Sequence, residues 1–590
     1  MSSRVGVFIC WCGTNIAGTV DVHHVVEQLK KLPEVAHAEN YMYMCSDPGQ
    51  DKVKAAIEGA GLNRLVVASC SPRMHENTFR KAAQSVGLNP YLVEIANIRE
   101  QCSWVHQTQK SIATRKAYNI IKATVEKVVR NASLEAIRVP LTKRALVVGA
   151  GIAGISAALE MADAGYDTIV VERDSEAGGK VRYLSKTFPY HEDASAILLP
   201  KVEALVNHPN ITFLPSSTVT GVTGYVGNFE VQIQANTPAD ADNVEPLTRT
   251  ESVGALVVAT GYDLYPVEKM AEYGAGKIPD VIDSMAFEGL LKESFASGTP
   301  VKRPSDGRPV GSVVFIQCSG SRDPENHKPY CSRICCLYTN KQARLFREQN
   351  PDGRAYVSFM DIRTDCKNTE EYCQANIDEK GLVYIRGRVS KLWREGGKVG
   401  VWTADTLTNE KLELTVDLVV LAQAVQPSEG YAQVSSTFRA GVDSNGFFQE
   451  SHIKLRPVES STRGVYLAGA GQYPKDITDS VAQAMATASK IQSLFANEEL
   501  SQDPLVCRVD PDVCSACGLC VPICPYGARE VDDLALFSRV NEALCEGCGA
   551  CVAVCPNKAC QLKNDSMVQV VNEIEVFTAE EDEEGYCCSG

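Results

Sequence analysis

Short apolar runs alternate with helix-like segments along the first 130 residues. The runs VGVFIC and RLVVASC predict buried strands, and another strand is expected to end at Cys45. Helices are predicted near residues 21–32, 51–60 and 105–130. This alternation is typical of an open α/β sheet, in which the carboxyl ends of parallel strands meet in one crevice.

A second series of apolar runs begins at residue 145. ALVVG predicts a buried strand, a helical segment continues to Gly165, and DTIVVE predicts a strand that ends at Glu172. Between strand and helix, Gly149, Gly151 and Gly154 have the spacing G-x-G-x-x-G. These glycines permit a tight turn and the approach of a pyrophosphate to the helix N-terminus, and Glu172 suits a ribose hydroxyl. The pattern therefore predicts a dinucleotide site.

Downstream segments resemble two-dinucleotide-domain flavoproteins of the thioredoxin reductase and glutathione reductase type. Gly178-Gly179-Lys180 precedes a β-rich stretch, and ALVVATGYD follows, in which Thr260 and Gly261 close a strand. The segment GVYLAGAGQYPKDITDSVAQAMATA resembles the last FAD-binding strand and helix of those enzymes. The resemblance implies that FAD, rather than NAD, occupies the first site.

One position departs from those flavoproteins. They usually have an acidic residue after the glycine of the last strand, where this chain has Ala470 and Gly471. We expect Gln472, Lys475 or Asp476 to replace it at the ribityl chain. The predicted FAD-binding residues are Gly149, Gly151, Gly154, Glu172, Gly179, Lys180, Thr260, Gly261, Gly471, Gln472, Lys475, Asp476 and Ile477.

The second dinucleotide domain lacks the glycine loop that would hold NAD(P)H. Its predicted strand SVVFIQ runs into Cys318-Ser319-Gly320, with one glycine only. We place Cys331, Cys335 and Cys336 at the start of a helix, so that residues four apart share one face. The four cysteines Cys318, Cys331, Cys335 and Cys336 then predict a cubane cluster in place of the nicotinamide. The alternative is that they are small buried hydrophobic residues.

Two cysteine runs near the C-terminus follow the pattern C-x2-C-x2-C-x3-C-P, which is that of bacterial two-cluster ferredoxins. In that pattern the fourth cysteine of each run ligates the other cluster. One predicted ligand set is Cys514, Cys517, Cys520 and Cys555, and the other is Cys545, Cys548, Cys551 and Cys524. A pair of zinc ribbons is the alternative, but it gives no reason for the repeated Cys-Pro ending.

Four early cysteines predict a fourth cluster. Cys10, Cys45 and Cys70 lie at or just beyond predicted strand ends, so that with Cys12 they converge on the crevice of the sheet. Cys102 is a fifth candidate. The alternative is a small α/β dimerisation domain with incidental thiols.

Composition narrows the class of protein. The chain has 590 residues, 23 cysteines and a net charge of −15, which argues for metal binding and against a nucleic-acid partner. No apolar stretch is long enough to predict a transmembrane segment. The start MSSRVGVFICWCG does not resemble a signal peptide, so we expect a cytoplasmic protein.

The whole arrangement resembles the A subunit of heterodisulfide reductase and its bacterial relatives. The resemblance rests on FICWCGTNI, CSDPGQ, ASCSPRMHE and NIREQCSWVH, then on the flavin fold, KPYCSRICC, GQYPKDI and the ferredoxin pattern. Larger members have a ferredoxin domain inserted in the flavin domain. This chain has no cysteine between Lys180 and Ala259, which predicts a short form without the insertion.

The resemblance implies an oxidoreductase subunit with FAD and about four [4Fe-4S] clusters, a homodimer that bifurcates electron pairs between ferredoxin and a disulfide. Implied partners are disulfide-reducing and cluster-relay subunits and a hydrogenase, formate dehydrogenase or NADH-oxidising module. Alternatives are non-bifurcating delivery in a benzoyl-CoA reductase type or quinone-linked complex, or a redox scaffold. We expect Lys341 to act catalytically at the flavin; a solvated helix lysine is the alternative.

The fold class predicted is therefore α/β, with a thioredoxin reductase-like core, an N-terminal α/β domain and a C-terminal ferredoxin domain. Cys587 and Cys588 are a candidate ligand pair in an otherwise exposed acidic tail. The predicted divisions are 1–130 (N-terminal domain), 131–143 (linker), 144–300 (FAD domain), 301–430 (cluster-bearing second domain), 431–500 (return to the FAD domain), 501–570 (ferredoxin) and 571–590 (tail).

Overall fold

The computed structural model describes residues 3–236, 247–532 and 534–579. The chain divides into two compact units, one formed by Met1–Val139 with Ser501–Gly590 and the other by Pro140–Leu500. The tail cysteines Cys587 and Cys588 lie outside the described residues. Among the described residues, no helix combines the length and the apolarity needed to cross a membrane.

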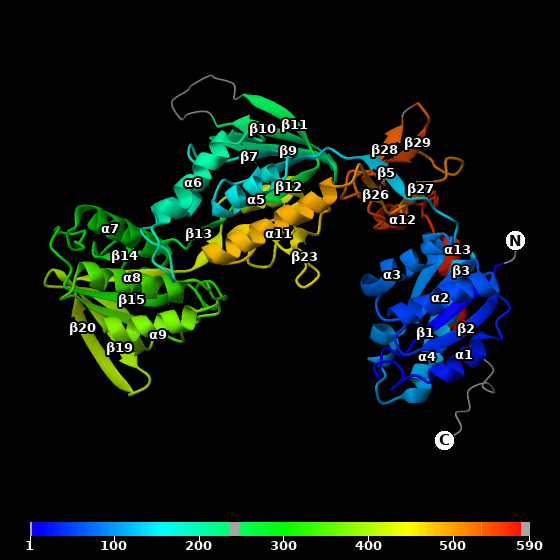
Figure 1. Cartoon of the computed structure of the whole chain (residues 1–590), viewed down its shortest axis with the longest axis horizontal. Helices are drawn as coiled ribbons and strands as arrows, with labels where there is room; N and C mark the ends of the chain where they lie inside the picture. Colours follow the sequence, from blue (N-terminus) through cyan, green and yellow to red (C-terminus); the bar gives the residue numbers. More distant parts are fainter. Residues whose placement is uncertain (1–2, 237–246, 533, 580–590) are drawn as a thin grey trace. The chain divides into compact units, whose positions relative to one another are not determined.

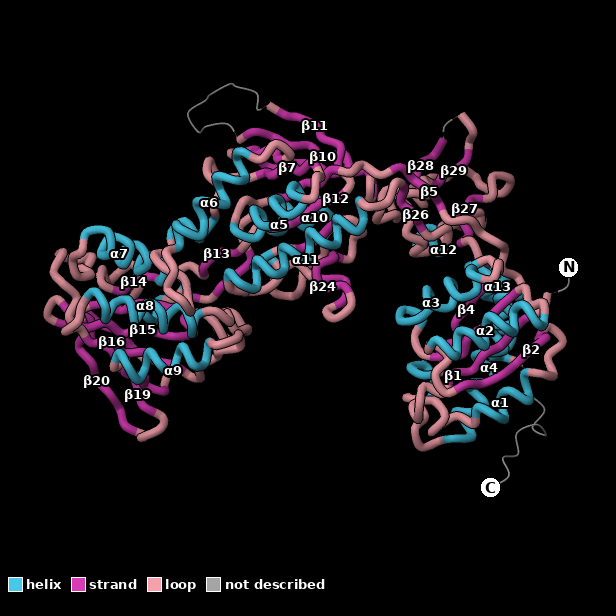
Figure 2. The backbone as a smooth tube through the Cα atoms, viewed as in Figure 1, coloured by secondary structure: helices cyan, strands magenta, loops and turns pink. Residues whose placement is uncertain are grey.

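A four-stranded parallel sheet in the order β2-β1-β3-β4 forms the centre of the N-terminal domain. Figure 2 shows the helices that cover it. The elements are β1 (Val5–Cys10), α1 (Val22–Leu29), β2 (Val35–Tyr41), α2 (Asp47–Ala60), β3 (Arg64–Ser69), α3 (Pro72–Ser85), β4 (Val93–Asn97) and α4 (Lys110–Val129). Of these, α3 and β4 were not predicted from the sequence.

Alternate residues of β1 enter two different cores. Val7 and Ile9 pack with α1 and α4, whereas Phe8 and Cys10 pack with α2 and α3. All six residues of β1 are buried, as expected for a strand covered on both faces. Because β1 and β3 are parallel neighbours, Cys10 at the end of β1 and Cys70 just after β3 lie at the same edge of the sheet.

The C-terminal segment folds as two small hairpin-like sheets around the cysteine runs. Its elements are β27 (Cys507–Val509), β28 (Arg529–Asp532), β29 (Phe537–Val540), α12 (Ala550–Val554), β30 (Cys560–Leu562) and α13 (Met567–Thr578). β27 pairs with β30 and β28 pairs with β29, both antiparallel. Residues 571–578, assigned to the tail from the sequence, are instead the last part of α13.

Helix α13 packs on α4 within the first unit. The Gln569 side chain donates to Asn131 Oδ1 at 2.7 Å, and Ala132 N donates to Asn564 Oδ1 at 2.8 Å. Lys127 and Asp565 approach to 3.5 Å. Helix α13 is therefore held at the end of the N-terminal domain by specific polar contacts.

The second unit contains the flavin-type fold, built on a seven-stranded sheet in the order β23-β24-β25-β12-β6-β7-β8. Figure 1 shows α5 and α11 side by side along this sheet, whose other face is covered by a β9-β10-β11 sheet. The bounds are β6 (Arg144–Val148), α5 (Ile152–Asp163), β7 (Asp167–Val171), α6 (Ala194–Asn207), β8 (Ile211–Leu214), β9 (Ser217–Tyr225), β10 (Asn228–Ala235), β11 (Thr248–Val253), β12 (Ala255–Val258), α10 (Tyr431–Phe438), β23 (Glu450–His452), β24 (Arg456–Ser460), β25 (Val465–Leu467) and α11 (Ile477–Phe495).

A five-stranded parallel sheet, β14-β21-β15-β16-β17, supports the second dinucleotide-type domain. One face packs against α7 and α8, and the other packs against the antiparallel sheet β18-β19-β20. The bounds are β14 (Val281–Asp283), α7 (Ser284–Ser297), β15 (Ser312–Ser319), α8 (Cys335–Gln349), β16 (Arg354–Phe359), α9 (Thr369–Lys380), β17 (Val383–Arg386), β18 (Lys391–Glu395), β19 (Lys398–Asp405), β20 (Glu410–Val416) and β21 (Leu418–Gln423).

Two short ribbons complete the described strands. β13 (Tyr262–Leu264) pairs with β22 (Val425–Pro427) where the chain passes between the two dinucleotide-type domains. β5 (Ile137–Pro140) pairs with β26 (Glu499–Gln502) where the chain passes between the units.

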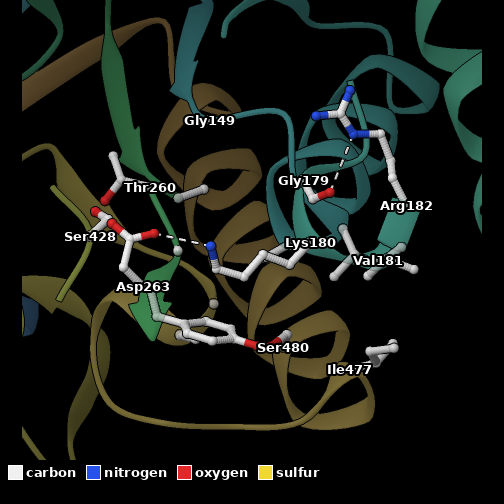
Figure 3. A pocket seen from close by; sticks show the side chains of 18 of the residues that line it. Gly149, Gly179, Lys180, Val181, Arg182, Thr260, Asp263, Ser428, Ile477 and Ser480 are labelled. Carbon is white, nitrogen blue, oxygen red and sulfur yellow. Dashed lines mark hydrogen bonds and ion pairs between the residues drawn. The ribbon is translucent and has the colours of Figure 1, made fainter. Parts of the chain in front are cut away.

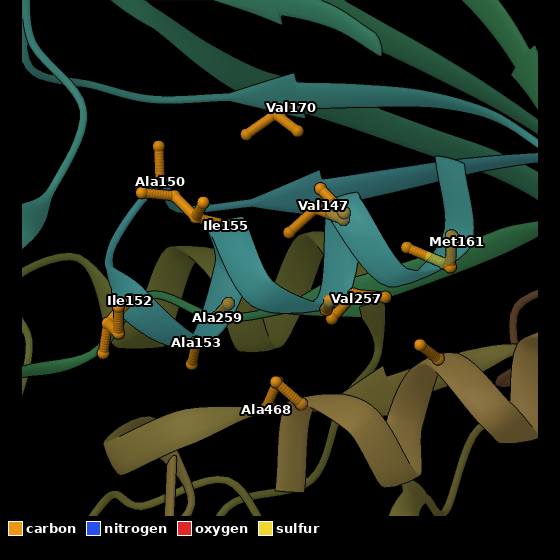
Figure 4. Close-up of a cluster of buried hydrophobic side chains, with 14 of the residues drawn as sticks. Val147, Ala150, Ile152, Ala153, Ile155, Met161, Val170, Val257, Ala259 and Ala468 are labelled. Carbon is orange, nitrogen blue, oxygen red and sulfur yellow. The ribbon is translucent and has the colours of Figure 1, made fainter. Parts of the chain in front are cut away.

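The core between α5, α11 and the sheet consists largely of small and β-branched residues (Figure 4). Ala153 and Ala468 allow helix and strand to approach closely, while Ile155, Val147 and Val257 fill the remaining volume. This packing fixes α5 at the end of β6, where the glycine loop lies.

Replacing the fully buried Ile155 with Ala should therefore destabilise this core. We expect Ile155→Ala to lower the free energy of unfolding by about 2 to 5 kcal/mol, because the surrounding sheet cannot close the cavity. Denaturant unfolding followed by fluorescence measures the change. The matched control is Met485→Ala on α11, where the side chain is 47% exposed and a change below about 0.5 kcal/mol is expected. Equal effects of both substitutions would contradict this description of the core.

Candidate functional site

The second unit contains a cavity of about 680 Å³. Part of its wall is the glycine loop after β6, and part is α8 of the second dinucleotide-type domain. Figure 3 shows Gly149, Gly179, Thr260 and Ile477 around this space. A cavity of this size accommodates a large cofactor.

The glycines of the loop, here called the glycine cradle, occupy positions where a side chain would either clash with the backbone or enter the cavity. Gly149 has φ +101°, and a Cβ there would lie 2.4 Å from the Ala259 carbonyl oxygen. A Cβ at Gly154 would lie 1.8 Å from the Gly149 carbonyl oxygen, so Gly154 holds α5 against the loop and does not line the cavity. At Gly151, which does line the cavity, a Cβ would meet no protein atom within 4 Å. Of these three glycines, Gly151 is therefore the one at which an added Cβ would project into the cavity without meeting the protein.

Glu172 follows β7 directly and contacts the glycine loop. One carboxylate oxygen accepts from Ala150 N at 2.6 Å, and the other accepts from Asp174 N at 3.0 Å. These bonds hold the buried carboxylate in the cavity wall. Each oxygen retains a lone pair for a ribose hydroxyl.

Two residues predicted from the sequence show polar atoms facing the cavity. Thr260 Oγ1 is buried without a hydrogen-bond partner among the described residues, although its residue lines the cavity. Lys180 forms an ion pair with Asp263 at 3.0 Å (Figure 3). An orphaned hydroxyl and a fixed ammonium group fit a polar cofactor. Asp263, two residues after Gly261, was not predicted from the sequence although it belongs to the ATGYD segment.

Three of the five FAD-binding residues predicted between 471 and 477 line the cavity. Lys475, Asp476 and Ile477 line the cavity. Gly471 and Gln472 do not line it, and the Gln472 side chain donates to Glu450 at 2.8 Å. Burial lowers the pKa of Lys475 to about 7, so this ammonium can lose its proton near neutrality.

Helix α8 forms another part of the cavity wall through Tyr338, Lys341 and Gln342. Lys341 is 2% exposed and forms an ion pair of 2.6 Å with Glu288, which is equally buried. Its ammonium also donates to the Lys186 carbonyl at 2.8 Å. Burial alone would raise the pKa of Glu288, but the contact with Lys341 lowers it. The net effect is a pKa below the usual range of a glutamate. The alternative that Lys341 is a solvated helix lysine is therefore wrong.

Three of the four cysteines of the second domain lie together at the start of α8. Cys318, at the end of β15, and Cys336 lie close enough to Cys335 to raise the pKa of its thiol, together with burial. Cys331 precedes the helix, which begins at Cys335, so the expectation that both lie on one helical face is wrong. Instead the loop turns back, and Cys331 Sγ accepts from Arg333 N at 3.2 Å, where Arg333 has φ +62°.

The N-terminal cysteines converge at one edge of their sheet. Cys12 and Cys45 lie near enough to Cys10, and Cys10 and Cys12 near enough to Cys70, to act on its thiol, but burial is the main reason that the pKa values of Cys10 and Cys70 are raised. Cys10 Sγ accepts from the backbone N–H groups of Cys12 and Met44 at 3.3 and 3.4 Å. Cys45 lies in the loop after β2, which ends earlier than predicted because the chain turns after Tyr41.

Arg99 contacts these cysteines, whereas Cys102 lies apart from them. Arg99 donates to Cys12 Sγ at 3.2 Å, which places a cation beside the thiols. The fully buried Cys102 instead donates to the Ala113 carbonyl at 3.1 Å in the core beneath α4. The geometry favours the four-cysteine set over one that includes Cys102.

In the ferredoxin segment, backbone N–H groups also point at cysteine sulfurs. Cys507 N donates to Cys545 Sγ and Ser538 N to Cys514 Sγ, both at 3.4 Å, and Ala528 N donates to Cys524 Sγ at 3.3 Å. Such donors are typical of cysteines that carry negative charge. This donor set fits iron-sulfur clusters.

Cys507 and Cys560, which were left unassigned from the sequence, lie among the predicted ligands. Their sulfurs and that of Cys551 are all within 4.8 Å of one another. The sequence does contain a signal for them: the residues that flank the two cysteine runs repeat along with the runs, and Cys507 and Cys560 lie in these flanking residues.

Cys366 is another cysteine that was left unassigned from the sequence. Its sulfur lies 3.6 Å from Asp476 Oδ2, close to Asp479. Arg333 forms ion pairs with Asp365 and Asp479 at this place. The local acidic charge is therefore already matched by a guanidinium group.

The sequence also matches known families. A family model described as pyridine nucleotide-disulphide oxidoreductase matches residues 143–286, and a 4Fe-4S dicluster domain model matches residues 513–560. Among solved structures, T. acidophilum thioredoxin reductase is 18% identical, with a TM-score of 0.42, over 60% of this chain and 100% of that chain.

Curated relatives match nearly the whole chain. The second iron-sulfur A subunit of CoB-CoM heterodisulfide reductase from Methanopyrus kandleri is 39% identical over 90% of this chain and 91% of its own. The A subunit of the H(2):CoB-CoM heterodisulfide,ferredoxin reductase from Methanothermobacter thermautotrophicus is 37% identical with the same coverage of both. This chain belongs to the family of heterodisulfide reductase A subunits.

Membership of the heterodisulfide reductase A family confirms several predictions. The chain is an oxidoreductase subunit with an α/β core that matches the pyridine nucleotide-disulphide oxidoreductase model and with a 4Fe-4S ferredoxin domain, and its cofactors are FAD and [4Fe-4S] clusters. The alignment with the M. kandleri relative spans 597 positions but includes only 90% of this 590-residue chain, so the relative has residues without a counterpart here.

Substitution of Gly151 tests the cradle. We expect Gly151→Ala to fold normally but to bind FAD at least tenfold more weakly, because the added methyl group meets no protein atom and projects into the cavity. Bound flavin after dialysis and far-UV circular dichroism measure the two effects. The control is Gly59→Ala on α2, where the methyl group also meets no atom within 4 Å. Full flavin occupancy in Gly151→Ala would show that the pyrophosphate does not approach this loop.

Proposed function

We propose that this chain is the FAD and iron-sulfur electron-transfer subunit of a heterodisulfide reductase-like complex, and that it bifurcates electron pairs between ferredoxin and a disulfide or other acceptor. Bound FAD exchanges electrons in pairs or singly, whereas clusters carry one electron at a time. The chain therefore supplies what is needed to convert one mode of transfer into the other.

One observation carries this proposal: the same helix serves both cofactors. Cys335 and Cys336 begin α8, and Tyr338, Lys341 and Gln342 of that helix line the cavity. A cluster held by Cys318, Cys331, Cys335 and Cys336 is therefore the redox neighbour of the flavin in this proposal. Short separation along one rigid helix favours direct electron transfer between the two sites.

Lys341 is proposed to act at the flavin edge. Its side chain is buried in the cavity wall, where Glu288 and the Lys186 carbonyl fix the direction of the ammonium group. Glu288 is itself held by the Ser185 hydroxyl at 2.8 Å and by Gln342 at 2.8 Å. This network can present a fixed positive charge to an electron-rich ring without motion of the lysine.

The remaining ligand sets complete the proposed route. Cys10, Cys12, Cys45 and Cys70 hold a cluster in the N-terminal domain, and the ferredoxin segment holds two.

We further propose that the chain forms a homodimer. Its proposed partners are disulfide-reducing and cluster-relay subunits and a hydrogenase, formate dehydrogenase or NADH-oxidising module. Isolation of the native complex and identification of its subunits tests the partners. Co-purification only with a CoA-ester reductase would favour non-bifurcating delivery instead.

The cluster beside the flavin can be removed selectively. We expect the anaerobically loaded wild type to contain one FAD and about 16 irons, and Cys336→Ala about 12, because one thiolate of one cluster is lost. Iron analysis and low-temperature EPR measure this, and the ferredoxin signals should remain. Cys373→Ala is the control, since Cys373 is a buried cysteine facing α8 that belongs to no ligand set. Loss of the cluster with unchanged electron transfer from flavin to partners would refute the route through α8.

NADH should not reduce the isolated chain. The strand β15 ends in Cys318 and Ser319, and the single glycine that follows, Gly320, is packed so closely on Tyr265 that a Cβ would lie 2.6 Å from its ring. The expected result is an unchanged flavin absorption band after anaerobic addition of NADH, while dithionite bleaches it. Rapid bleaching by NADH in the absence of partners would refute this prediction.

A further inference from the structure

One side of helix α8 faces the cavity along its first two turns. The residues that line the cavity are Ile334, at the N-cap of the helix, and Tyr338, Lys341 and Gln342 within it. Residues three, four or seven positions apart lie above one another on a helix, so these four form one row. The row starts beside Cys335, the first residue of α8. One face of the helix therefore leads from the cysteines into the cavity wall.

Tyr338 is the member of this row that also packs on the cysteines. Cys335, Cys336 and Ala422 form a small buried group, here called the cysteine core, and Tyr338 and Ile362 pack against it. Of these five residues, Tyr338 alone lines the cavity. Helical side chains lean toward the helix N-terminus, so the ring of Tyr338 lies over the turn that begins at Cys335. A single side chain thus contacts both the cysteine core and the cavity.

The ring of Tyr338, and not its hydroxyl group, faces the cavity. The residue as a whole is partly exposed, but its hydroxyl oxygen is buried in the protein. Burial raises the pKa of Tyr338 well above its usual range, so the phenol stays protonated and neutral. Tyr338 therefore presents an uncharged aromatic surface to whatever occupies the cavity.

An aromatic surface at this place fits the planar ring system of FAD. Aromatic rings associate in offset-stacked or edge-to-face arrangements, and closely packed groups leave no room for water between them. The same side chain packs on Cys335 and Cys336, which belong to the ligand set proposed for the cluster of the second dinucleotide-type domain. With both cofactors bound, Tyr338 provides a continuous path of packed protein atoms between them.

We infer that Tyr338 is the side chain through which the flavin exchanges single electrons with the cluster of Cys318, Cys331, Cys335 and Cys336. One electron leaves the reduced flavin and enters the oxidised cluster, or passes in the opposite direction. No covalent bond of Tyr338 forms or breaks, and its proton stays on the phenol oxygen. The inference rests on the second-domain cluster of the proposed function but not on bifurcation.

Flash reduction of the flavin in the loaded full-length chain tests this path. In the wild type we expect a fast phase in which the flavin is reoxidised as a cluster is reduced. EPR of freeze-quenched samples should assign the phase to the cluster that is lost in Cys336→Ala. Tyr338→Leu should lose the fast phase, because the shorter side chain leaves a gap where the ring made its contacts. Tyr338→Phe keeps the ring and should keep the fast phase.

Flavin binding and cofactor potentials show whether a slower rate reflects the path. Tyr338→Leu should bind FAD about two- to tenfold more weakly, which is the effect of losing one aromatic pair, whereas Tyr338→Phe should bind it like the wild type. The rates are therefore compared with FAD at saturation. Potentiometric titration should give the same flavin and cluster potentials in the wild type and in Tyr338→Leu, so that the driving force is equal.

Two matched controls separate the two contacts of Tyr338. Tyr183→Leu removes a tyrosine that lines the same cavity but is not packed on the cysteine core. Ile362→Ala removes a side chain that packs on the cysteine core but does not line the cavity. Both variants should keep the fast phase. Tyr338→Met lacks the ring but fills more of its volume than leucine, and its fast phase should be slower than that of Tyr338→Phe.

The outcomes distinguish this inference from the proposed function. An unchanged fast phase in Tyr338→Leu or in Tyr338→Met, at full flavin and iron content, would overturn the inference alone. Equal slowing in Tyr183→Leu or in Ile362→Ala would also overturn it, because the effect would not be specific to Tyr338. A wild type with about 12 irons and no cluster beside the flavin would instead refute the ligand set of the proposed function, and the inference with it.

Discussion

The backbone N–H group that donates to a cysteine sulfur is the contact on which the predicted cluster sites depend. It recurs at Cys10, at Cys331 and at Cys545 in three separate parts of the chain. Negative charge shared between iron and sulfur must be stabilised away from water, and N–H donors do this without burying further side-chain charge. The chain must therefore turn back on itself beside each thiolate, which explains the left-handed backbone of Cys12 and Arg333. The glycine loop before α5 meets the same requirement for a pyrophosphate.

Burial of charge also explains the wall formed by α8. A lysine and a glutamate with 2% exposure stabilise a fold only when every remaining polar atom is satisfied. Around Glu288 this is achieved by Ser185 and Gln342, which belong to different elements of the unit. The pair consequently links the loop after the glycine cradle to the helix that begins with the cysteines. A network of short polar contacts thus fixes the cavity wall relative to the cysteines at the start of α8.

The sequence predicted features that depend on local spacing. The glycine loop, Glu172 and the ferredoxin cysteine runs are each encoded within a few residues, because strand, turn and helix follow one another directly. Asp263 and Glu288 were missed because their partners, Lys180 and Lys341, are distant in sequence and meet only through tertiary packing. The start of α8 was misplaced because helical periodicity continues into residues that form a loop.

The contact between α13 and α4 has a consequence for biosynthesis. The N-terminal domain leaves the ribosome first, but the helix that covers α4 is made only after the whole second unit. At ~5–20 residues per second, the interval between Val129 and Met567 is on the order of half a minute. During this time the polar face formed by Asn131 and Ala132 is open to solvent. The first unit therefore cannot close over α4 until α13 has been synthesised.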